Sequence, residues 1–338
     1  MTEQIYIGKD DGKLRRPFQA SAQIRCRAYS RPLQRVITDF GADHAFGRVT
    51  GKLREHYGID VPQGAIVAMT EAHAQGISAG MMPTLRPSAV PLTLVAETDG
   101  SMIPVVETQA VCGGPTDLRK TRKLSWKEAK RVLVRRSDEV EPVFAVTLGD
   151  ATAAGTCLKQ LAVASGLNEK SRVHGLGDGA PWIAEQMERQ FGAQGGYLVD
   201  FYHTCDYLAA AAKICGKDYP EAWVALQKER LKTGQLSAVM DALSPCLEPD
   251  TLAADEAPVR RCYRYIANRP DPFKYREAIA ANLPIGSGEV ESAHRYIIQK
   301  RLKLPGAWWK KDNAQAMLNL RTARANHCWN PYWDALAA

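Results

Sequence analysis

The order of strand-like and helix-like runs between residues 91 and 203 constrains the fold of this chain most. Four runs rich in β-branched residues come first, and each has the length and texture of a strand: LTLVAETDG, SMIPVVET, EAKRVLVRR and EPVFAVTLG. Helix-like and strand-like runs then alternate through ATAAGTCLKQLAVASG, RVHGLGD, PWIAEQMERQF and GYLVDFYH. Strands that come first in hairpins and then alternate with helices predict a mixed α/β sheet.

Helical segments precede and follow these runs. Residues 31–78 contain three short amphipathic segments, and the last two, joined by the tight connection GIDVP, have the proportions of a helix-turn-helix. An ordinary helical hairpin that packs on the next domain explains the same pattern, so DNA contact by these helices is left open. Residues 204–283 are almost wholly helical, which predicts an insertion. The expected organisation is an irregular N-terminal segment (1–30), a helical region that is a candidate for DNA binding (31–78), a linker (79–90), the first part of the core (91–203), the helical insertion (204–283) and the C-terminal part of the core (284–338).

Composition narrows the class of protein further. A chain of 338 residues with 45% hydrophobic residues suggests two or three domains with a sizeable core. The net charge of +7 favours a polyanionic partner. The eight cysteines include no CxxC pair, so we expect free thiols rather than a zinc knuckle. No apolar run approaches a membrane span and no secretory signal is visible at the start, so we expect a cytoplasmic chain without membrane contact.

Three carboxylates occur where a site for phosphodiester chemistry would form. Such chemistry needs charge neutralisation at the phosphate and an activated oxygen nucleophile, and Mg²⁺ held by a few carboxylates supplies both. Asp99 closes a strand-like run before Gly100, Asp178 closes another before a helix, and Glu291 lies in the first turn of a helix. Each has an ordinary structural explanation as a turn residue, a helix cap or a partner of the helix dipole. Helical periodicity does not choose between Glu289 and Glu291.

The strings VAETDG, GLGDGAPWI, YLVDFYH, PIGSGEVESAHR and RLKLPGAWW followed by AMLNLR resemble bacterial insertion-sequence transposases. These belong to the DDE, or RNase H-like, superfamily, and the nearest resemblance is to the ISKra family. It runs from about residue 30 to the C-terminus and is strongest over 91–203 and 283–334. The resemblance implies an α/β, RNase H-like mixed sheet interrupted by a helical insertion, preceded by the helix-turn-helix-like region.

What the resemblance implies for the site is a catalytic, metal-binding triad of Asp99, Asp178 and Glu291. Two Mg²⁺ ions, for which Mn²⁺ would substitute, are the expected cofactors. Related transposases carry an Asp-x-x-His signature between the second and third acidic residues, and here Asp200 and His203 supply it. We expect this pair either to contact and orient the triad residues or to position DNA. The alternative is that His203 is a buried histidine at a strand end whose hydrogen bonds are made within the protein.

The implied activity is DNA transposition: metal-dependent cleavage at the ends of an insertion sequence, then strand transfer into target DNA. Such recombination joins two ends at once, so a homo-oligomer bound to DNA in the bacterial nucleoid is expected. One alternative is an RNase H-like nuclease or resolvase that cuts without joining. The other is a catalytically silent DNA-binding regulator derived from a transposase.

A basic segment follows the last carboxylate. Its cations start within a few residues of Glu291, so we predict that they contact DNA phosphates. Trp308 and Trp309 lie in the same segment; they either stack on unpaired bases or pack into the core, and packing is favoured because large aromatic residues mostly bury. The predicted DNA-binding residues are Arg295, Lys300, Arg301, Lys303, Lys310 and Lys311.

Overall fold

The computed structural model describes residues 4–21, 29–78, 85–108, 121–269 and 273–337. The chain forms two compact units. Unit 1 comprises Met1–Met82, Ile103–Trp126 and Arg295–Ala338, and unit 2 comprises Pro83–Met102 and Lys127–His294. This division differs from the organisation expected from sequence, because residues 295–338 group with the N-terminal helices instead of with the sheet. The expected linker at 79–90 lies partly outside the described residues.

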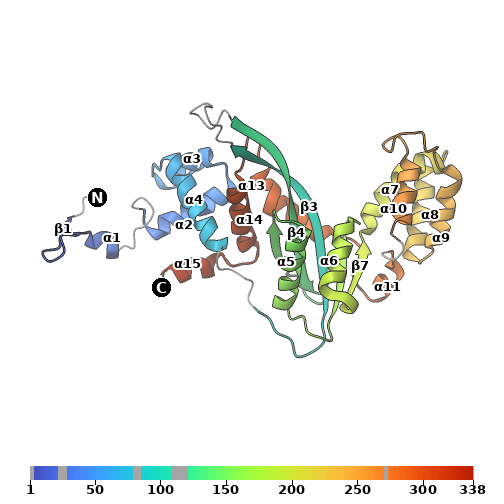
Figure 1. Cartoon of the computed structure of the whole chain (residues 1–338), viewed down its shortest axis with the longest axis horizontal. Helices are drawn as coiled ribbons and strands as arrows, with labels where there is room; N and C mark the ends of the chain where they lie inside the picture. The colour runs from blue at the N-terminus through green and yellow to red at the C-terminus, as the bar shows by residue number, and fades with distance from the viewer. Residues whose placement is uncertain (1–3, 22–28, 79–84, 109–120, 270–272, 338) are drawn as a thin grey trace. The chain divides into compact units, whose positions relative to one another are not determined.

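Unit 2 is built on a five-stranded sheet (Figure 1). The strands lie in the order β5-β4-β3-β6-β7; β4 and β5 are antiparallel, whereas β3, β6 and β7 run parallel to one another. The sheet is therefore mixed, as the sequence predicted. The strands are β3 (Thr93–Thr108), β4 (Arg122–Arg136), β5 (Val143–Thr147), β6 (Arg172–Gly177) and β7 (Gly195–Val199).

The first two predicted strands are one strand in the structure. Asp99 and Gly100 were expected to form a turn, but both lie inside β3, which continues to Thr108. A Cβ atom at Gly100 would lie only 2.0 Å from Oε1 of Glu128 on β4. The glycine therefore serves close approach to a neighbouring side chain and not a turn.

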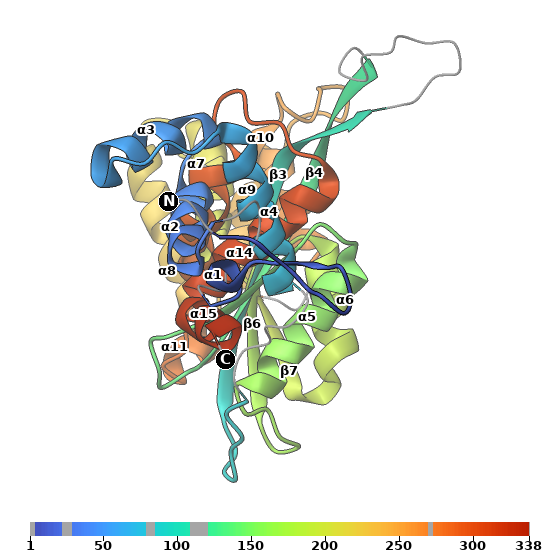
Figure 2. The ribbon, with the colours of Figure 1, turned by 90° about the vertical axis from the view of Figure 1, so that its left-hand side faces the viewer.

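Each face of the sheet is covered by helices. The helices α5 (Ala151–Ala164) and α6 (Pro181–Phe191) pack side by side on one face (Figure 2). Their apolar residues share one core cluster with alternate residues of the strands, including Leu94, Val132 and Val173. The intervening residues of the strands, such as Val95 and Leu176, face the opposite cluster, which they share with α7 (Phe201–Cys215). This alternation is the period of two that a strand buried on both faces requires.

The described residues of the predicted insertion form helices joined by turns and loops, with no strand among them. Its helices after α7 are α8 (Pro220–Lys232), α9 (Leu236–Leu243), a 3₁₀ turn (Ser244–Cys246), α10 (Pro258–Ala267) and α11 (Tyr275–Ala280). They enclose a core that includes Leu208, Leu231, Leu243 and Ile266. The described cysteines are all free thiols.

Unit 1 is mainly helical. A small core centred on Ile37, Leu53 and Ile66 joins α2 (Arg31–Asp43), α3 (Phe46–Tyr57) and α4 (Gln63–Ser78), and α4 also packs along α14 (Lys311–Ala325). The N-terminal segment, expected to be irregular, contains a two-stranded ribbon and a short helix. The elements are β1 (Tyr6–Ile7), β2 (Leu14–Arg15), α1 (Pro17–Ser21), α2 (Arg31–Asp43), α3 (Phe46–Tyr57), α4 (Gln63–Ser78), a π-helical turn (His294–Gln299) that follows α12 of unit 2, α13 (Lys300–Leu302), α14 (Lys311–Ala325) and α15 (Trp329–Ala337).

The packing of α4 bears on the helix-turn-helix expectation. Gly58, with φ of +64°, ends α3, and α4 begins at Gln63, so the tight connection is present. However, α4 contains no lysine or arginine, and its apolar face is buried. This arrangement favours the alternative of a helical hairpin that packs within its own unit. Within the part of the chain that the structure describes, no helix is long and apolar enough to cross a membrane.

A buried histidine in unit 1 makes the stability depend on pH. His73 is 8% exposed, with Nε2 2.9 Å from Oε1 of Gln34 and Nδ1 2.8 Å from the hydroxyl of Tyr332. The side-chain amide of Gln34 donates a hydrogen bond through Nε2 to the carbonyl of Tyr29. Its Oε1 therefore faces His73 and accepts a hydrogen bond from Nε2 of that ring. The hydroxyl of Tyr332 then donates to Nδ1, and the neutral ring satisfies both contacts. Burial lowers the pKa of His73 to about 4.

We predict that unit 1 loses stability as the pH falls from about 6.5 to about 4. In this window an unfolded histidine takes up a proton that the folded His73 does not, so the free energy of unfolding falls by at most about 1.4 kcal/mol per pH unit. Urea unfolding of the wild type and of His73→Gln between pH 4 and 7 measures this. If the free energy of unfolding fell equally with pH in both proteins, His73 would not be the residue responsible.

Candidate active site

Three aspartates form a row at the ends of the parallel strand pairings. In the register of the sheet, Thr98 of β3 pairs with Gly177 of β6, and Gly177 pairs with Val199 of β7. The next residue after each of these is an aspartate: Asp99, Asp178 and Asp200. Parallel strands in register bring these positions side by side, so the row follows directly from the sheet.

The row opens into a pocket of about 270 Å³ within unit 2. Glu291, exposed in the first turn of α12 (Gly288–Ala293), lines the same pocket. The structure therefore brings together the three carboxylates that the sequence analysis singled out, although 113 residues separate Asp178 from Glu291. The pocket is lined by Asp99, Asp178, Asp200, Tyr202, His203, Asp206, Ser287, Gly288, Val290 and Glu291.

The segment that carries Glu291 is held to the strand ends by hydrogen bonds. His174 Nε2 donates to the carbonyl of Pro284 at 2.8 Å, and the Phe201 amide donates to the carbonyl of Ile285 at 2.9 Å. Asp200 Oδ2 accepts from both the amide and the hydroxyl of Ser287, at 2.5 and 2.6 Å. We call residues 284–291 the PIGSGEVE segment.

Two buried side chains hold the peptide groups of Val290. Glu97 Oε2 accepts from the Val290 amide at 2.8 Å, and Arg131 Nη1 donates to its carbonyl at 2.9 Å. Glu97 is fully buried, and burial raises its pKa to about 8. Neither residue was predicted from the sequence. For Glu97 a signal was available, since it is a charged residue inside an otherwise apolar strand run, where a buried charge requires a partner. Arg131 lies among other charged residues of its strand, so the local pattern did not distinguish it.

The same contacts separate Glu289 from Glu291. Glu289 receives a bidentate ion pair from Arg135, whose Nε and Nη2 both lie 2.7–2.9 Å from its carboxylate oxygens. Glu289 is not among the residues that line the pocket, whereas Glu291 is. The geometry favours Glu291 as the third acidic residue of the site, which helical periodicity left open.

Asp99 lies between opposite influences. Burial raises its pKa above the ordinary value, the Arg131 guanidinium opposes that rise, and the negative charges of Asp178 and Glu291 add to it. Asp99 Oδ2 pairs with Arg131, and Oδ1 accepts from the Gly100 amide at 2.7 Å. Asp178 and Glu291 thus lie near enough to Asp99 for their negative charges to affect its pKa.

Asp178 is held by hydrogen bonds to its carbonyl and to its carboxylate. Its carbonyl accepts from the Tyr265 hydroxyl at 2.7 Å, and its Oδ1 accepts from the Ala180 amide at 2.9 Å. Gly179 has φ of +89°, and a Cβ there would lie 2.8 Å from the Tyr265 hydroxyl and from Nε of Arg269. Only glycine satisfies both constraints. The insertion, which supplies Tyr265 and Arg269, thus supports this end of the site.

The donor set suits a hard divalent cation. Five carboxylates line the pocket, and Mg²⁺ prefers oxygen ligands and keeps several waters, so it needs few protein ligands. As the side chains stand, no group of three His, Cys, Asp or Glu residues within the described ranges is arranged to hold a metal ion. Arg131 supplies the positive charge that pairs with Asp99. The pocket therefore matches such an ion in the chemical type of its side chains.

Asp200 and His203 both line the pocket. Asp200 is 7% exposed, and besides holding Ser287 it caps α7 by accepting from the His203 amide at 2.8 Å. The His203 ring packs against Tyr207 and Tyr265. Asp200 is therefore a positioning residue for the PIGSGEVE segment, whereas a role of His203 in DNA positioning stays a prediction.

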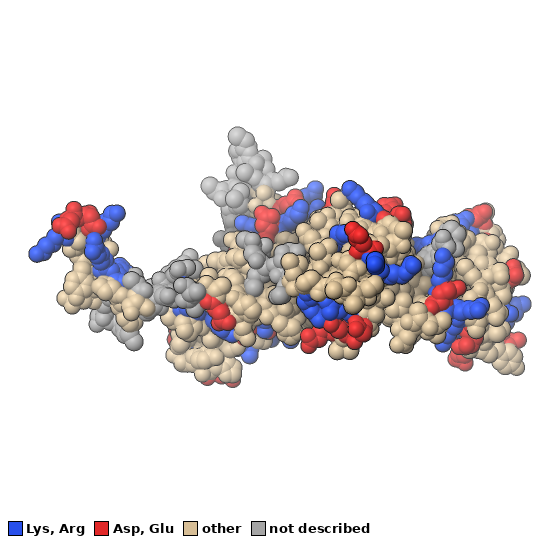
Figure 3. Space-filling model, turned by 90° about the horizontal axis from the view of Figure 1, so that it is seen from below, with Lys and Arg blue, Asp and Glu red and all other residues tan. Residues whose placement is uncertain are grey.

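The residues predicted to contact phosphates differ in their exposure to solvent. Arg295, Lys300, Lys310 and Lys311 are exposed and Lys303 is half-buried. The prediction is wrong for Arg301, which is 2% exposed and donates to the carbonyl of Gly41 at 2.9 Å. Its guanidinium packs against aromatic rings, so it stabilises the interior of unit 1. On the face drawn in Figure 3, cations and carboxylates are interspersed instead of forming one basic field.

The candidate site is thus a cluster of carboxylates located where the parallel strand pairings of a mixed α/β sheet end. Comparison with known proteins adds a family likeness: the model described as "Uncharacterised protein family (UPF0236)" matches residues 166–330. The chain is also 26% identical over 157 residues to the "UPF0236 protein in vanSb 3'region" of Streptococcus gallolyticus, over 46% of this chain and 34% of that protein. The match thus spans about a third of the length of that relative. The resemblance to ISKra transposases stays a prediction.

Among solved structures, the chain is similar to the "Drosophila P element transposase strand transfer complex". The sequence identity is 8% and the TM-score is 0.32, over 93% of this chain and 83% of that chain. A TM-score this low does not establish a shared fold.

We predict that Asp200→Ala loosens the PIGSGEVE segment. The substitution removes a helix cap and two charge-assisted hydrogen bonds, so the free energy of unfolding should fall by about 3 kcal/mol. Amide hydrogen exchange over residues 286–291 should accelerate at least tenfold, as measured by mass spectrometry. Asp206→Ala, at an exposed position on the next turn of α7, is the control. Unchanged exchange over 286–291 in Asp200→Ala would show that Asp200 does not hold this segment.

Proposed function

We propose that this protein is a metal-dependent DNA transposase of the RNase H-like type. Asp99, Asp178 and Glu291 are its catalytic carboxylates, and DNA at the ends of a mobile element is its substrate. One observation carries the proposal: the three acidic residues selected from sequence line a single pocket, although they come from two strands and a distant helix.

Three further features support this assignment. Carboxylates that lie where the parallel strand pairings end and in the first turn of a helix are held rigidly, as phosphoryl transfer requires. The mixed sheet with a helical insertion before the last acidic residue agrees with the architecture that the resemblance implies. The basic residues Lys300, Lys310 and Lys311 are exposed, as phosphate contact requires.

The proposed reaction has two steps. In the first, the oxygen of a water molecule attacks a phosphodiester at the element end; the bond from phosphorus to the 3′-oxygen breaks, and that oxygen leaves as a 3′-hydroxyl after taking up a proton. In the second, this hydroxyl attacks a phosphodiester of the target DNA, and one phosphodiester bond replaces another.

The residues of the chain prepare the site for this chemistry. Asp99, Asp178 and Glu291 would hold two divalent cations, which supply charge neutralisation at the phosphate and activation of the attacking oxygen. Arg131 holds Asp99 in place, and its second contact with the Val290 carbonyl fixes the start of the helix that carries Glu291. Asp200 fixes the same segment from the other side through Ser287.

We predict that Asp99→Asn, Asp178→Asn and Glu291→Gln each lower cleavage by about 10³-fold or more, because residues that act as a unit fail together. The assay uses a labelled duplex that carries the end of the element, with Mg²⁺ or Mn²⁺, and follows both nicking and joining. Glu289→Gln is the matched control, because it keeps an acceptor for Arg135 on the same helix; its cleavage should stay within a few-fold of the wild type.

The outcomes separate the alternatives. Nicking without joining, under conditions that allow both, would indicate a nuclease or resolvase. A band shift by the wild type without any nicking in either metal would indicate a DNA-binding regulator, and the proposed activity would then be wrong.

A further inference from the structure

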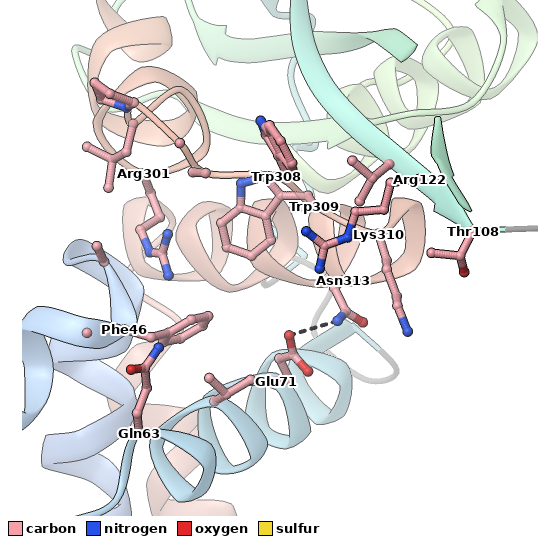
Figure 4. Close-up of a pocket in the computed structure, with 18 residues that line it drawn as sticks. Phe46, Gln63, Glu71, Thr108, Arg122, Arg301, Trp308, Trp309, Lys310 and Asn313 are labelled. Carbon is pink, nitrogen blue, oxygen red and sulfur yellow. Dashed lines mark hydrogen bonds between the residues drawn. The ribbon is translucent and has the colours of Figure 1, made fainter. Parts of the chain in front are cut away.

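Unit 1 contains a wide pocket of about 760 Å³ that the proposed chemistry does not use (Figure 4). Residues of α3, α4, β3, β4 and the chain between α13 and α14 line it. Its volume lies within the range of small-ligand and nucleotide sites. The residues that line it determine which class of ligand it would bind.

Two adjacent tryptophans are held at this pocket by their backbone. Ala307 donates its amide to the carbonyl of Leu304 at 2.9 Å, and Gly306 has φ of +74°, so the chain turns sharply just before them. The Val106 amide of β3 then donates to the carbonyl of Trp309 at 2.8 Å. The turn and the strand contact together fix the backbone that carries both indoles.

The two indoles have different surroundings. Trp309 is 5% exposed, and the Arg301 guanidinium packs against its ring and that of Phe46, with 4.7 and 4.5 Å to the ring centroids. The two rings also meet edge to face, with 6.3 Å between their centroids, and this cluster forms one wall of the pocket. Trp308 is 55% exposed, and the Arg122 guanidinium lies 5.8 Å from its ring centroid. An aromatic face next to an exposed arginine is thus left open to solvent.

The rest of the lining is largely apolar, and its charged residues are more often positive than negative. The cations among the lining residues are Arg122, Arg301 and Lys310, against Glu71 alone. Figure 4 shows Arg122 and Lys310 on the side of Thr108, and the hydrogen bond of 2.7 Å from Asn313 Nδ2 to Glu71 Oε1 across the floor. Burial raises the pKa of Glu71. Amide and carboxyl groups at the floor offer both donors and acceptors.

These features fit one kind of ligand. A nucleobase presents a flat π-face for stacking and an edge with donors and acceptors, and its sugar-phosphate chain carries the negative charge that Arg122 and Lys310 attract. Bases paired inside a duplex have both faces covered by their neighbours, so only an unpaired base can enter such a pocket.

We propose that this pocket binds an unpaired nucleobase of DNA, with Trp308 stacking on the base and with Arg122 and Lys310 binding the flanking phosphates. The choice of DNA as the nucleic acid rests on the proposed function; the recognition of an unpaired base does not. The site acts in binding and takes no part in bond cleavage.

The test compares two DNA probes in EDTA, where no cleavage takes place. One is a blunt duplex hairpin, and the other is the same hairpin with a 3′ overhang that carries 2-aminopurine. Binding is measured by anisotropy, and stacking by quenching of the 2-aminopurine fluorescence. Wild-type protein should bind the overhang probe more tightly and quench it.

Trp308→Ala should weaken binding of the overhang probe about tenfold, remove the quenching, and leave binding of the blunt hairpin unchanged. Trp308→Phe should restore most of both signals, because it keeps an aromatic face. Trp126→Ala is the matched control: Trp126 belongs to unit 1 and is 57% exposed, but it does not line the pocket.

Equal losses in Trp308→Ala and Trp126→Ala, or an equal loss for both probes, would overturn the proposal. This outcome is independent of the triad, because the assay contains no metal. If the protein cleaved DNA under no condition but still quenched 2-aminopurine in a manner that depends on Trp308, the transposase proposal would be rejected. The proposal of a base-binding pocket would then stand. A preference for the same overhang made of RNA would overturn the choice of DNA.

Discussion

The attachment of the PIGSGEVE segment to the ends of the parallel strands is the interaction on which the candidate site depends. Each strand of the row contributes: Glu97 from β3, His174 from β6, and Asp200 directly after β7. Arg131 on β4 adds a fourth anchor at the carbonyl of Val290. Without these contacts Glu291 would be a surface glutamate on a short helix, far in sequence from the two aspartates.

The anchors are buried polar groups, which makes the arrangement sensitive to single changes. A buried carboxyl or guanidinium that loses its partner keeps its desolvation cost without compensation. Arg131 illustrates this, because one guanidinium holds both Asp99 and the start of α12. Glycines complete the fit where side chains approach closely: a Cβ at Gly286 would lie 2.6 Å from the Tyr202 ring. The network therefore fixes the backbone that carries Glu291 next to the strands that carry the aspartates, before any ligand binds.

Unit 1 uses its cations differently from what a basic segment suggests. Arg301 is buried against Phe46 and Trp309, and Arg321 is buried with its Nε bound to the carbonyl of Ile297 and its Nη1 bound to Asp43. Such arginines stabilise the packing of α14 with the N-terminal helices. Of the exposed residues, Arg122, Lys310 and Trp308 line the pocket of unit 1, which shares no residue with the carboxylate pocket.

The sequence by itself determined the mixed sheet, the helical insertion and the choice of Asp99, Asp178 and Glu291 as candidates. These follow from periods of two and 3.6 residues, from the position of acids after strand-like runs, and from long motif strings, all of which are local. The continuous strand through Asp99 and Gly100 was not predictable, because Asp-Gly commonly makes a turn and only the contact with Glu128 reveals why the glycine is there. The choice between Glu289 and Glu291, the burial of Arg301 and the partners of Glu97 and Arg131 were decided by tertiary structure alone. Each depends on a contact with a residue more than 100 positions away in sequence, and no local pattern carries that information.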